Sequence, residues 1–149
     1  MTVPNFEKYF MGFARQASTR SNCLRNNVGA VIVDKFNKIK ATGYNGTPSK
    51  IESCMEKGHC YRIENNIPSG TRYETCQSIH AEQNAIIQAG EFGCRESSIY
   101  IYGHSYCCIL CKRFIIQSGI EHIYIQKDES SPIIYIDVED FKKELNGNL

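Results

Sequence analysis

The hydrophobic positions of this chain follow helical spacing in some segments and strand spacing in others. Apolar side chains recur about every 3.6 residues between positions 4 and 20, which predicts an amphipathic helix after Pro4. Residues 28–33 form an unbroken apolar run, as expected of a buried strand. Residues 39–44 supply its antiparallel partner, and residues 34–38 form the turn of the resulting hairpin.

Helices and strands alternate through the second half of the chain. The pattern at residues 79–89 predicts a helix with Ser78 as its N-cap, and Gly90 and Gly93 terminate it. The remaining expected elements are a strand at 98–102, a helix at 108–118 ending at Gly119, strands at 122–126 and 133–136, and a helix capped by Asp137 that runs to about residue 145.

These elements indicate an α/β fold built on one sheet. A hairpin followed by alternating helices and strands predicts a mixed five-stranded sheet with helices on both faces, which is a three-layer α/β/α sandwich. The chain has 149 residues, of which 42% are hydrophobic and 22% are charged. These values are typical of one globular domain, so we expect residues 1–149 to form a single unit.

Charge and hydropathy narrow the classes of function. The 17 basic and 16 acidic residues give a net charge of +1, which does not favour the binding of long nucleic acid. No apolar run approaches the roughly 18 residues of a membrane span. The N-terminal sequence has no signal-peptide pattern, so we expect a cytoplasmic protein without a membrane partner.

The candidate chemistry lies in His80-x-Glu82 and, further along, Cys108-x-x-Cys111. One histidine and two cysteines supply three ligands for a catalytic zinc ion and leave the fourth tetrahedral position for water or substrate. Zinc lowers the pKa of bound water towards neutrality, and Glu82 is placed to move protons. This order of residues is the signature of zinc nucleobase deaminases.

Each half of this signature also has a simpler explanation. A lone His-x-Glu is common by chance, and a lone Cys-x-x-Cys is equally typical of a redox pair or of half a structural zinc site. Together they favour a catalytic zinc. The proline that usually precedes the first cysteine is replaced by Cys107, but only Cys108 has the spacing to Cys111 that fits one metal. We therefore assign Cys107 to packing.

A second group of cysteines lies mainly within residues 50–78, a segment that is polar and is expected to be irregular. A long polar segment rarely becomes ordered without help, and a closed four-ligand structural zinc would order this one. The predicted ligands are Cys23, Cys54, Cys60 and Cys76, with His59 as an alternative ligand. The competing interpretation is that these cysteines are free, partly buried thiols.

Several segments between residues 20 and 126 resemble the cytidine deaminase superfamily, most closely its deoxycytidylate (dCMP) deaminases. Residues 28–33 resemble the first strand, residues 43–48 (Gly-Tyr-Asn-Gly-Thr-Pro) the substrate loop, and residues 80–86 (His-Ala-Glu-Gln-Asn-Ala-Ile) the zinc helix. Cys108-x-x-Cys111 followed by residues 118–120 resembles the second zinc helix. The resemblance implies a cytidine deaminase-like fold.

The resemblance also implies a reaction and the residues that carry it out. Zinc-bound hydroxide would add to C4 of the cytosine ring of dCMP, and Glu82 would move the proton to N3 and help ammonia to leave. The product, dUMP, is a precursor of thymidylate. Asn45 would hydrogen-bond the sugar, and the backbone of Ala81 would contact the base. The phosphate ligands stay open among Thr47, Ser49, Arg25 and Lys50.

The resemblance further implies a homo-oligomer, often a hexamer in this family, and the deoxynucleoside triphosphates dCTP and dTTP as effectors. Two other functions remain as alternatives at this point. A deaminase acting on RNA or DNA would need base flipping and a basic surface, which the charge balance does not favour. A non-enzymatic zinc module would leave Glu82 without a role.

Overall fold

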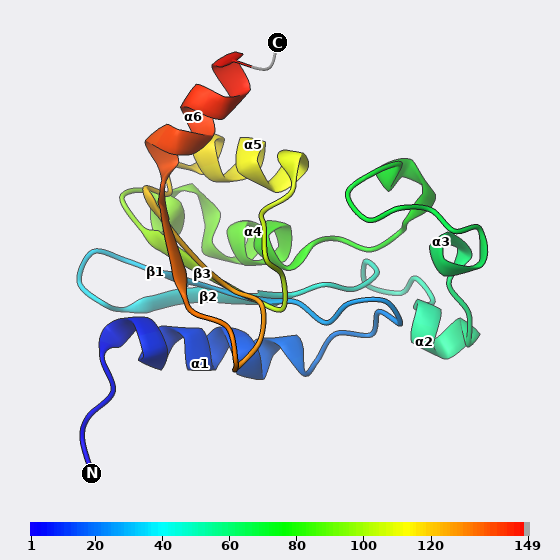
Figure 1. Ribbon diagram of the computed structural model, residues 1–149, viewed down its shortest axis with the longest axis horizontal. Helices are drawn as coiled ribbons and strands as arrows, with labels where there is room; N and C mark the ends of the chain where they lie inside the picture. The colour runs from blue at the N-terminus through cyan, green and yellow to red at the C-terminus, as the bar shows by residue number, and fades with distance from the viewer. Residues whose placement is uncertain (148–149) are drawn as a thin grey trace.

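The computed structural model describes residues 1–147 and contains the expected mixed five-stranded sheet, part of which is labelled in Figure 1. The strand order is β2-β1-β3-β4-β5, and only β3 and β4 run parallel. The strands are β1 (Gly29–Val33), β2 (Ile39–Tyr44), β3 (Ser98–Tyr102), β4 (His122–Gln126) and β5 (Ile134–Asp137). The predicted fold class is therefore confirmed, and each predicted strand agrees with the structure to within one residue at either end.

Helices cover both faces of the sheet and complete the three layers. Helix α1 (Phe6–Ser18) lies on one face, and α4 (Ala81–Cys94) and α5 (Ile109–Ser118) lie on the other (Figure 1). Helix α6 (Val138–Gly147) packs against α5 and β5. The side chains of β1 are all buried because this strand is covered on both faces. Ala30 and Ile32 join the core beneath α4 and α5, while Val31 and Val33 pack against α1.

The start of α4 differs from the sequence prediction. The N-cap is His80, not Ser78, and the helix runs beyond residue 89 to Cys94. Ile79 exchanges two backbone hydrogen bonds with Gly46, of 2.8 and 3.1 Å, and this bridge keeps residues 78–79 extended. Gly90 does not end the helix but interrupts it, with φ 68° and ψ 178°.

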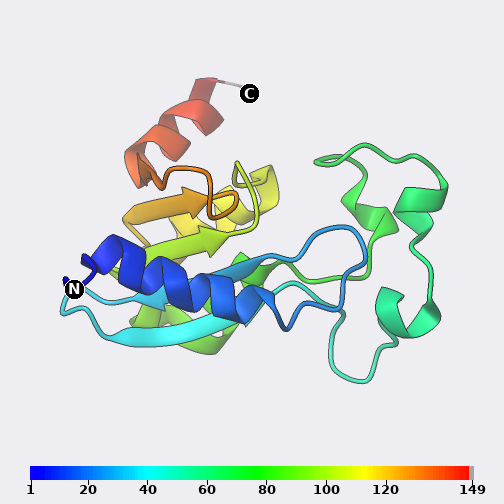
Figure 2. The same cartoon turned by 60° about the horizontal axis from the view of Figure 1, so that its bottom comes forward.

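Residues 50–78 are more regular than predicted, and they extend away from the sheet (Figure 2). They contain α2 (Cys54–Lys57), α3 (Tyr61–Glu64) and the 3₁₀ turn η1 (Tyr73–Thr75). Helix α2 begins with a capping box: the Ser53 hydroxyl accepts a hydrogen bond from the Glu56 amide, and the Glu56 carboxylate accepts one from the Ser53 amide. Within residues 1–147, no helix combines the length and apolar character needed to cross a bilayer.

Candidate metal centre and active site

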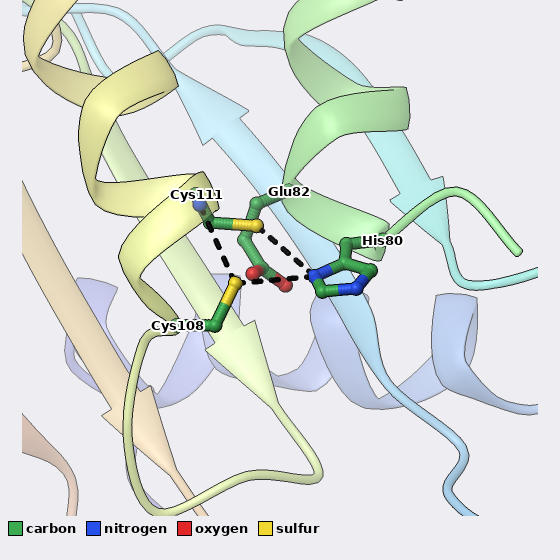
Figure 3. A group of neighbouring side chains, drawn as sticks. All are labelled: His80, Glu82, Cys108 and Cys111. Carbon is green, nitrogen blue, oxygen red and sulfur yellow. Dashed lines mark hydrogen bonds between the residues drawn. The ribbon is translucent and has the colours of Figure 1, made fainter. Parts of the chain in front are cut away.

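Two helix starts meet at one place, and their first residues bring the predicted ligands together. His80 is the N-cap of α4, Cys108 is the N-cap of α5, and Cys111 lies in the first turn of α5. The Nδ1 atom of His80 lies 3.3 Å from the Sγ atom of Cys108 and 3.3 Å from that of Cys111 (Figure 3). Residues far apart in the chain therefore form one compact group, as the sequence predicted.

The local backbone fixes these side chains in place. The Cys108 thiol accepts a hydrogen bond from the backbone N–H of Cys111 at 3.4 Å, so it caps α5. The backbone N–H of His80 donates to Oε1 of Gln83 at 2.9 Å, which anchors the start of α4. Helix starts present free amides and a partial positive charge, and both stabilise thiolates.

The donor set fits a zinc ion. For Zn–N and Zn–S bonds of about 2.0 and 2.3 Å at a tetrahedral angle, a nitrogen and a sulfur ligand lie about 3.5 Å apart. The 3.3 Å separations from His80 are close to this value. Within the described chain, the one group of three or more metal-ligating side chains with ligand atoms within 4.8 Å of one another is His80, Glu82, Cys108 and Cys111.

Electrostatics at this site also favour a cation. Hydrogen bonding from Cys111, followed by that from His80, lowers the pKa of the Cys108 thiol to about 3. The pKa of Cys111 is raised by side-chain hydrogen bonds with Cys107 and Cys108, and burial raises it further. The Cys108 thiol also raises the pKa of His80. A divalent cation bound here would favour the ionised form of both thiols.

Glu82 is buried beside the ligands, although carboxylates are seldom buried. Its side chain is only 5% exposed, and its carboxylate points towards the same space as the His80 ring and the two thiols (Figure 3). A buried carboxylate at this position can exchange protons with a group held next to it. Cys107 is also buried but lies in the hydrophobic core outside this cluster, in agreement with its assignment to packing.

A pocket opens over the cluster, with a volume of about 100 Å³. Its walls combine both helix starts with the segments around residues 25, 45, 70 and 105. The lining side chains include the predicted site residues His80, Ala81, Glu82, Cys108 and Asn45, together with Arg25, Arg62, Tyr73, His104 and Tyr106. The pocket is therefore assembled from segments distant in sequence, as expected of a binding site for a small molecule.

The predicted substrate residues differ in their placement. Asn45 lies in the pocket wall, where its side chain accepts a hydrogen bond from Val28 N at 2.9 Å and donates to Asn26 O at 2.8 Å. Ala81 lies in the same wall with its side chain fully buried. Thr47 lines a neighbouring cavity instead, and its hydroxyl donates to Ile51 O. The structure does not bring Thr47 to the metal centre.

Arg62 is a pocket residue that sequence reasoning missed. Its side chain is only 6% exposed, and its guanidinium donates to the carbonyls of Pro68, Thr71 and Arg72 and to the hydroxyl of Thr75. These bonds fold the loop that carries Tyr73, whose ring packs edge-on against His80 with centroids 5.2 Å apart. No local sequence pattern predicts these hydrogen bonds, because the groups that accept them from Arg62 are mainly backbone carbonyls.

The second cysteine group is gathered less tightly than the first. Cys54, Cys60 and Cys76 line one cavity, and Cys23 and Cys76 contribute to the wall of the active-site pocket. Burial raises the pKa of Cys54, and the neighbouring Cys60 raises it further. The ring of His59 lies beside Glu64, with Nδ1 and Oε1 3.4 Å apart.

The mixed sheet and the cluster of His80, Glu82, Cys108 and Cys111 define a class of metal-binding α/β domain, and comparisons with known proteins identify its family. Residues 4–127 match the family model described as the cytidine and deoxycytidylate deaminase zinc-binding region. The chain belongs to this family.

Similar proteins carry related descriptions. Deoxycytidylate deaminase of Schizosaccharomyces pombe is 38% identical over 120 residues, which are 80% of this chain but 36% of that relative. Deoxycytidylate deaminase of Mycobacterium phage D29 is 32% identical over 132 residues, which are 86% of this chain and 99% of that relative. The crystal structure of dCMP deaminase from cyanophage S-TIM5 in complex with dCMP and dUMP has a TM-score of 0.61 and 26% identity, covering 84% of this chain and 83% of that one.

Proposed function

We propose that this chain is a zinc-dependent dCMP deaminase that hydrolyses dCMP to dUMP and ammonia, supplying dUMP for thymidylate synthesis. The observation that carries this proposal is the cluster of His80, Cys108 and Cys111 around one point, with the buried carboxylate of Glu82 beside it. The proposal is supported by relatives described as deoxycytidylate deaminases and by a related structure solved with dCMP and dUMP. In this proposal residues 1–149 act as one deaminase domain.

The chemistry divides between the metal and Glu82. His80, Cys108 and Cys111 would hold the zinc ion, which would lower the pKa of a bound water and so supply the nucleophile for C4 of the cytosine ring. Glu82 accepts the proton from this water and delivers it to N3 of the ring. The same carboxylate then carries the remaining proton of that water from the hydroxyl on C4 to the amino group, so that a C4 carbonyl forms, the C4–N bond breaks and ammonia leaves. Burial of Glu82 protects these transfers from exchange with bulk water.

Two further residues orient the substrate in this proposal. Ala81 contacts the base through its backbone, as the family resemblance implies, and this residue lines the pocket. Asn45 contacts the sugar in this proposal. Its side-chain amide has two donor hydrogens and two acceptor lone pairs, and the hydrogen bonds to Asn26 O and from Val28 N use one of each. Thr47 is left out of the proposed contacts because it lies outside the pocket.

A substrate panel tests the proposed function. The protein is incubated with dCMP, deoxycytidine, CMP and a single-stranded RNA, and ammonia release is measured alongside the ultraviolet change of the cytosine ring. We expect turnover of dCMP to exceed that of the other three substrates. Deamination of the RNA with none of dCMP would contradict the proposal. Repeating each reaction with dCTP and with dTTP tests whether these nucleotides act as effectors, as we infer from the family resemblance.

We also infer that Cys23, Cys54, Cys60 and Cys76 hold a second, structural zinc ion. Four thiolates are the ligand set of a closed tetrahedral site. This inference is supported by the shared cavity of Cys54, Cys60 and Cys76, and the four-cysteine set is preferred to one with His59 because that ring lies beside Glu64.

Metal analysis tests the second zinc. The purified protein is expected to contain a second equivalent of zinc, which Cys60→Ser removes while the first remains. Cys94→Ala is the matched control, since Cys94 is a buried core thiol outside both cysteine groups, and its zinc content is expected to equal that of the wild type. A wild-type protein with a single equivalent of zinc would contradict the inference.

Assembly and location complete the proposal. We infer a homo-oligomer, with the hexamer as the expected form. This is supported by large apolar side chains that are exposed in the single chain, such as Phe92 at 84% and Ile87 at 70%. A cytoplasmic location agrees with eight cysteines, all among the described residues, that form no disulfide, because reducing compartments keep thiols reduced. Sedimentation analysis of the purified protein measures the oligomeric state directly.

A further inference from the structure

A second cavity lies between helix α1 and residues 126–133, the segment that connects β4 to β5. Its volume is about 380 Å³, and none of the residues that line it also lines the pocket over His80. Helix α1 covers the face of the sheet opposite to α4 and α5, which carry the metal centre (Figure 1). The cavity is therefore separate from the proposed active site, and a molecule bound there would not occupy the place of the substrate.

Both walls of this cavity are held in place by polar contacts. In the connecting segment, Oδ1 of Asp128 accepts hydrogen bonds from the amide of Ser130 at 3.0 Å and from the hydroxyls of Ser130 and Ser131 at 2.7 and 2.8 Å. Across the cavity, Nη1 of Arg15 lies 2.5 Å from Oε1 of Glu129, so an ion pair connects α1 to this segment. The cavity therefore has a defined shape, as expected of a preformed binding site.

Gly12 forms part of the cavity wall in the middle of α1. Glycine inside a helix is less favourable than alanine, because it loses more conformational freedom on folding. At Gly29 and Gly43 the chain itself requires glycine, since an added Cβ would lie 1.9 and 2.3 Å from backbone oxygens. At Gly12 an added Cβ would meet no atom of the described residues within 4 Å. The missing side chain thus serves no contact within this part of the chain, and it opens the helix backbone to close approach by a bound molecule.

The cavity also carries one positive charge that the protein leaves unpaired. Lys8, Arg15 and Glu129 are the charged residues that line it, and Arg15 is paired with Glu129. None of the ion pairs formed within residues 1–147 involves Lys8. Pro132 and Ile133 supply apolar surface in the same lining. The cavity therefore combines one available ammonium group with apolar contacts, which suits a molecule with a charged end and an apolar body.

We propose that this cavity binds a small apolar molecule that carries a single carboxylate. The carboxylate pairs with Lys8, and the apolar body lies against Gly12 and Ile133. One available ammonium matches one negative charge, so dCTP and dTTP, with several negative charges each, are poorly suited to this cavity. A helix of a second copy is also poorly suited, because two turns of a helix about 10 Å across take up about 850 Å³. The cavity is less than half that size.

Calorimetry with a matched pair of probes tests the charge. The probes are 2-naphthoate, a planar apolar acid, and 2-naphthamide, which has nearly the same shape without the charge. The wild-type protein is expected to bind 2-naphthoate more tightly than 2-naphthamide. Lys8→Gln is expected to weaken the binding of 2-naphthoate alone by about 5-fold, the upper value for an ion pair in contact with solvent. Lys143→Gln is the control and is expected to change neither affinity, since Lys143 is exposed on α6 outside the cavity.

Gly12→Leu tests the shape of the cavity. A leucine side chain fills the space over the backbone of α1, so we expect neither probe to bind this variant. Leucine is a better helix former than glycine, and the Tm is expected to equal or exceed that of the wild type, which separates lost binding from unfolding. Gln16→Leu is the control and is expected to retain binding, because Gln16 is exposed one turn further along α1 and does not line the cavity.

Four results would overturn the proposal. A wild-type protein that does not bind 2-naphthoate, or a Gly12→Leu variant that binds it as the wild type does, would show that the cavity is not a binding site. Competition between 2-naphthoate and dUMP would place the probe in the pocket over the metal centre instead. Loss of self-association in Gly12→Leu, measured by sedimentation, would assign Gly12 to a contact between copies of the chain.

Discussion

Gly43 of β2 lies directly against Ala81 in the first turn of α4. A Cβ atom placed on Gly43 would lie 2.3 Å from the carbonyl oxygen of Ala81 and 2.5 Å from the backbone N of Ala85. Both atoms belong to the helix backbone, so they cannot move aside as the end of a flexible side chain does. The helix that carries His80 and Glu82 can approach the sheet this closely only because residue 43 has no side chain.

Replacing this glycine is therefore expected to displace the metal centre. Gly43→Ala forces α4 away from β2, which we expect to cost about 2 kcal/mol of unfolding free energy or more and to lower the zinc content. Gly12→Ala is the control, because Gly12 lies in α1 with no atom near its absent Cβ, and alanine there is expected to be neutral or to stabilise by up to about 1 kcal/mol. Thermal unfolding and metal analysis of both variants measure the difference. Full zinc content and wild-type stability in Gly43→Ala would contradict the packing argument.

Glu82→Gln tests the proton transfers separately from metal binding. Glutamine has nearly the same shape as glutamate but cannot accept and release a proton, so we expect turnover of dCMP to fall by at least about 100-fold. The zinc content is expected to stay at the wild-type level, since His80, Cys108 and Cys111 are untouched. Steady-state kinetics with metal analysis on the same sample check both statements. Unchanged turnover would remove Glu82 from the mechanism.

Cys108 caps α5 and is a proposed metal ligand, and the two roles can be tested separately. Serine is a good N-cap but a poor zinc ligand, whereas alanine can do neither. We expect both Cys108→Ser and Cys108→Ala to lose active-site zinc. With chelator present, the alanine variant is expected to be less stable than the serine variant by about 1 kcal/mol, the usual value of an N-cap. Urea unfolding in chelator measures this gap, and equal stabilities would mean that the hydrogen bond to Cys111 contributes nothing.

Arg62 is expected to determine the order of the pocket loop. Arg62→Met leaves the carbonyls of Pro68, Thr71 and Arg72 without their donor, and we expect this to cost about 3 kcal/mol of unfolding free energy. Arg62→Lys cannot reach all of these acceptors at once and is expected to recover only part of the loss. Limited proteolysis is expected to cut the methionine variant between residues 65 and 76 faster than the wild type. Identical cleavage rates would show that the loop is ordered by other contacts.

The sequence predicted the sheet well because its strands are specified locally. An unbroken apolar run identified β1, which is buried on both faces. The capping box of Ser53 and Glu56 was also readable in the sequence, although the segment was expected to be irregular. The start of α4 was misplaced because a long-range pairing decides it: Ile79 bonds to Gly46, 33 positions earlier, and so stays extended.

The same distinction between local and distant contacts applies to the site. The gathering of His80, Cys108 and Cys111 was predictable because their chemistry is specific and their spacing is informative. The placement of Thr47 outside the pocket was not predictable, since it follows from the course of the loop after β2. The role of Arg62 depends on carbonyl groups six to ten residues away, and any amino acid supplies a carbonyl.

The residues that begin α4 and α5 are also the proposed ligands of the metal. Filling the site would therefore tie two helix ends to each other and not only to their own backbones. Hydrogen exchange at the first-turn amides of both helices is expected to slow together when zinc is added, and to recover together when it is withdrawn. Metal supply would then govern the integrity of an entire edge of the molecule as well as its chemistry.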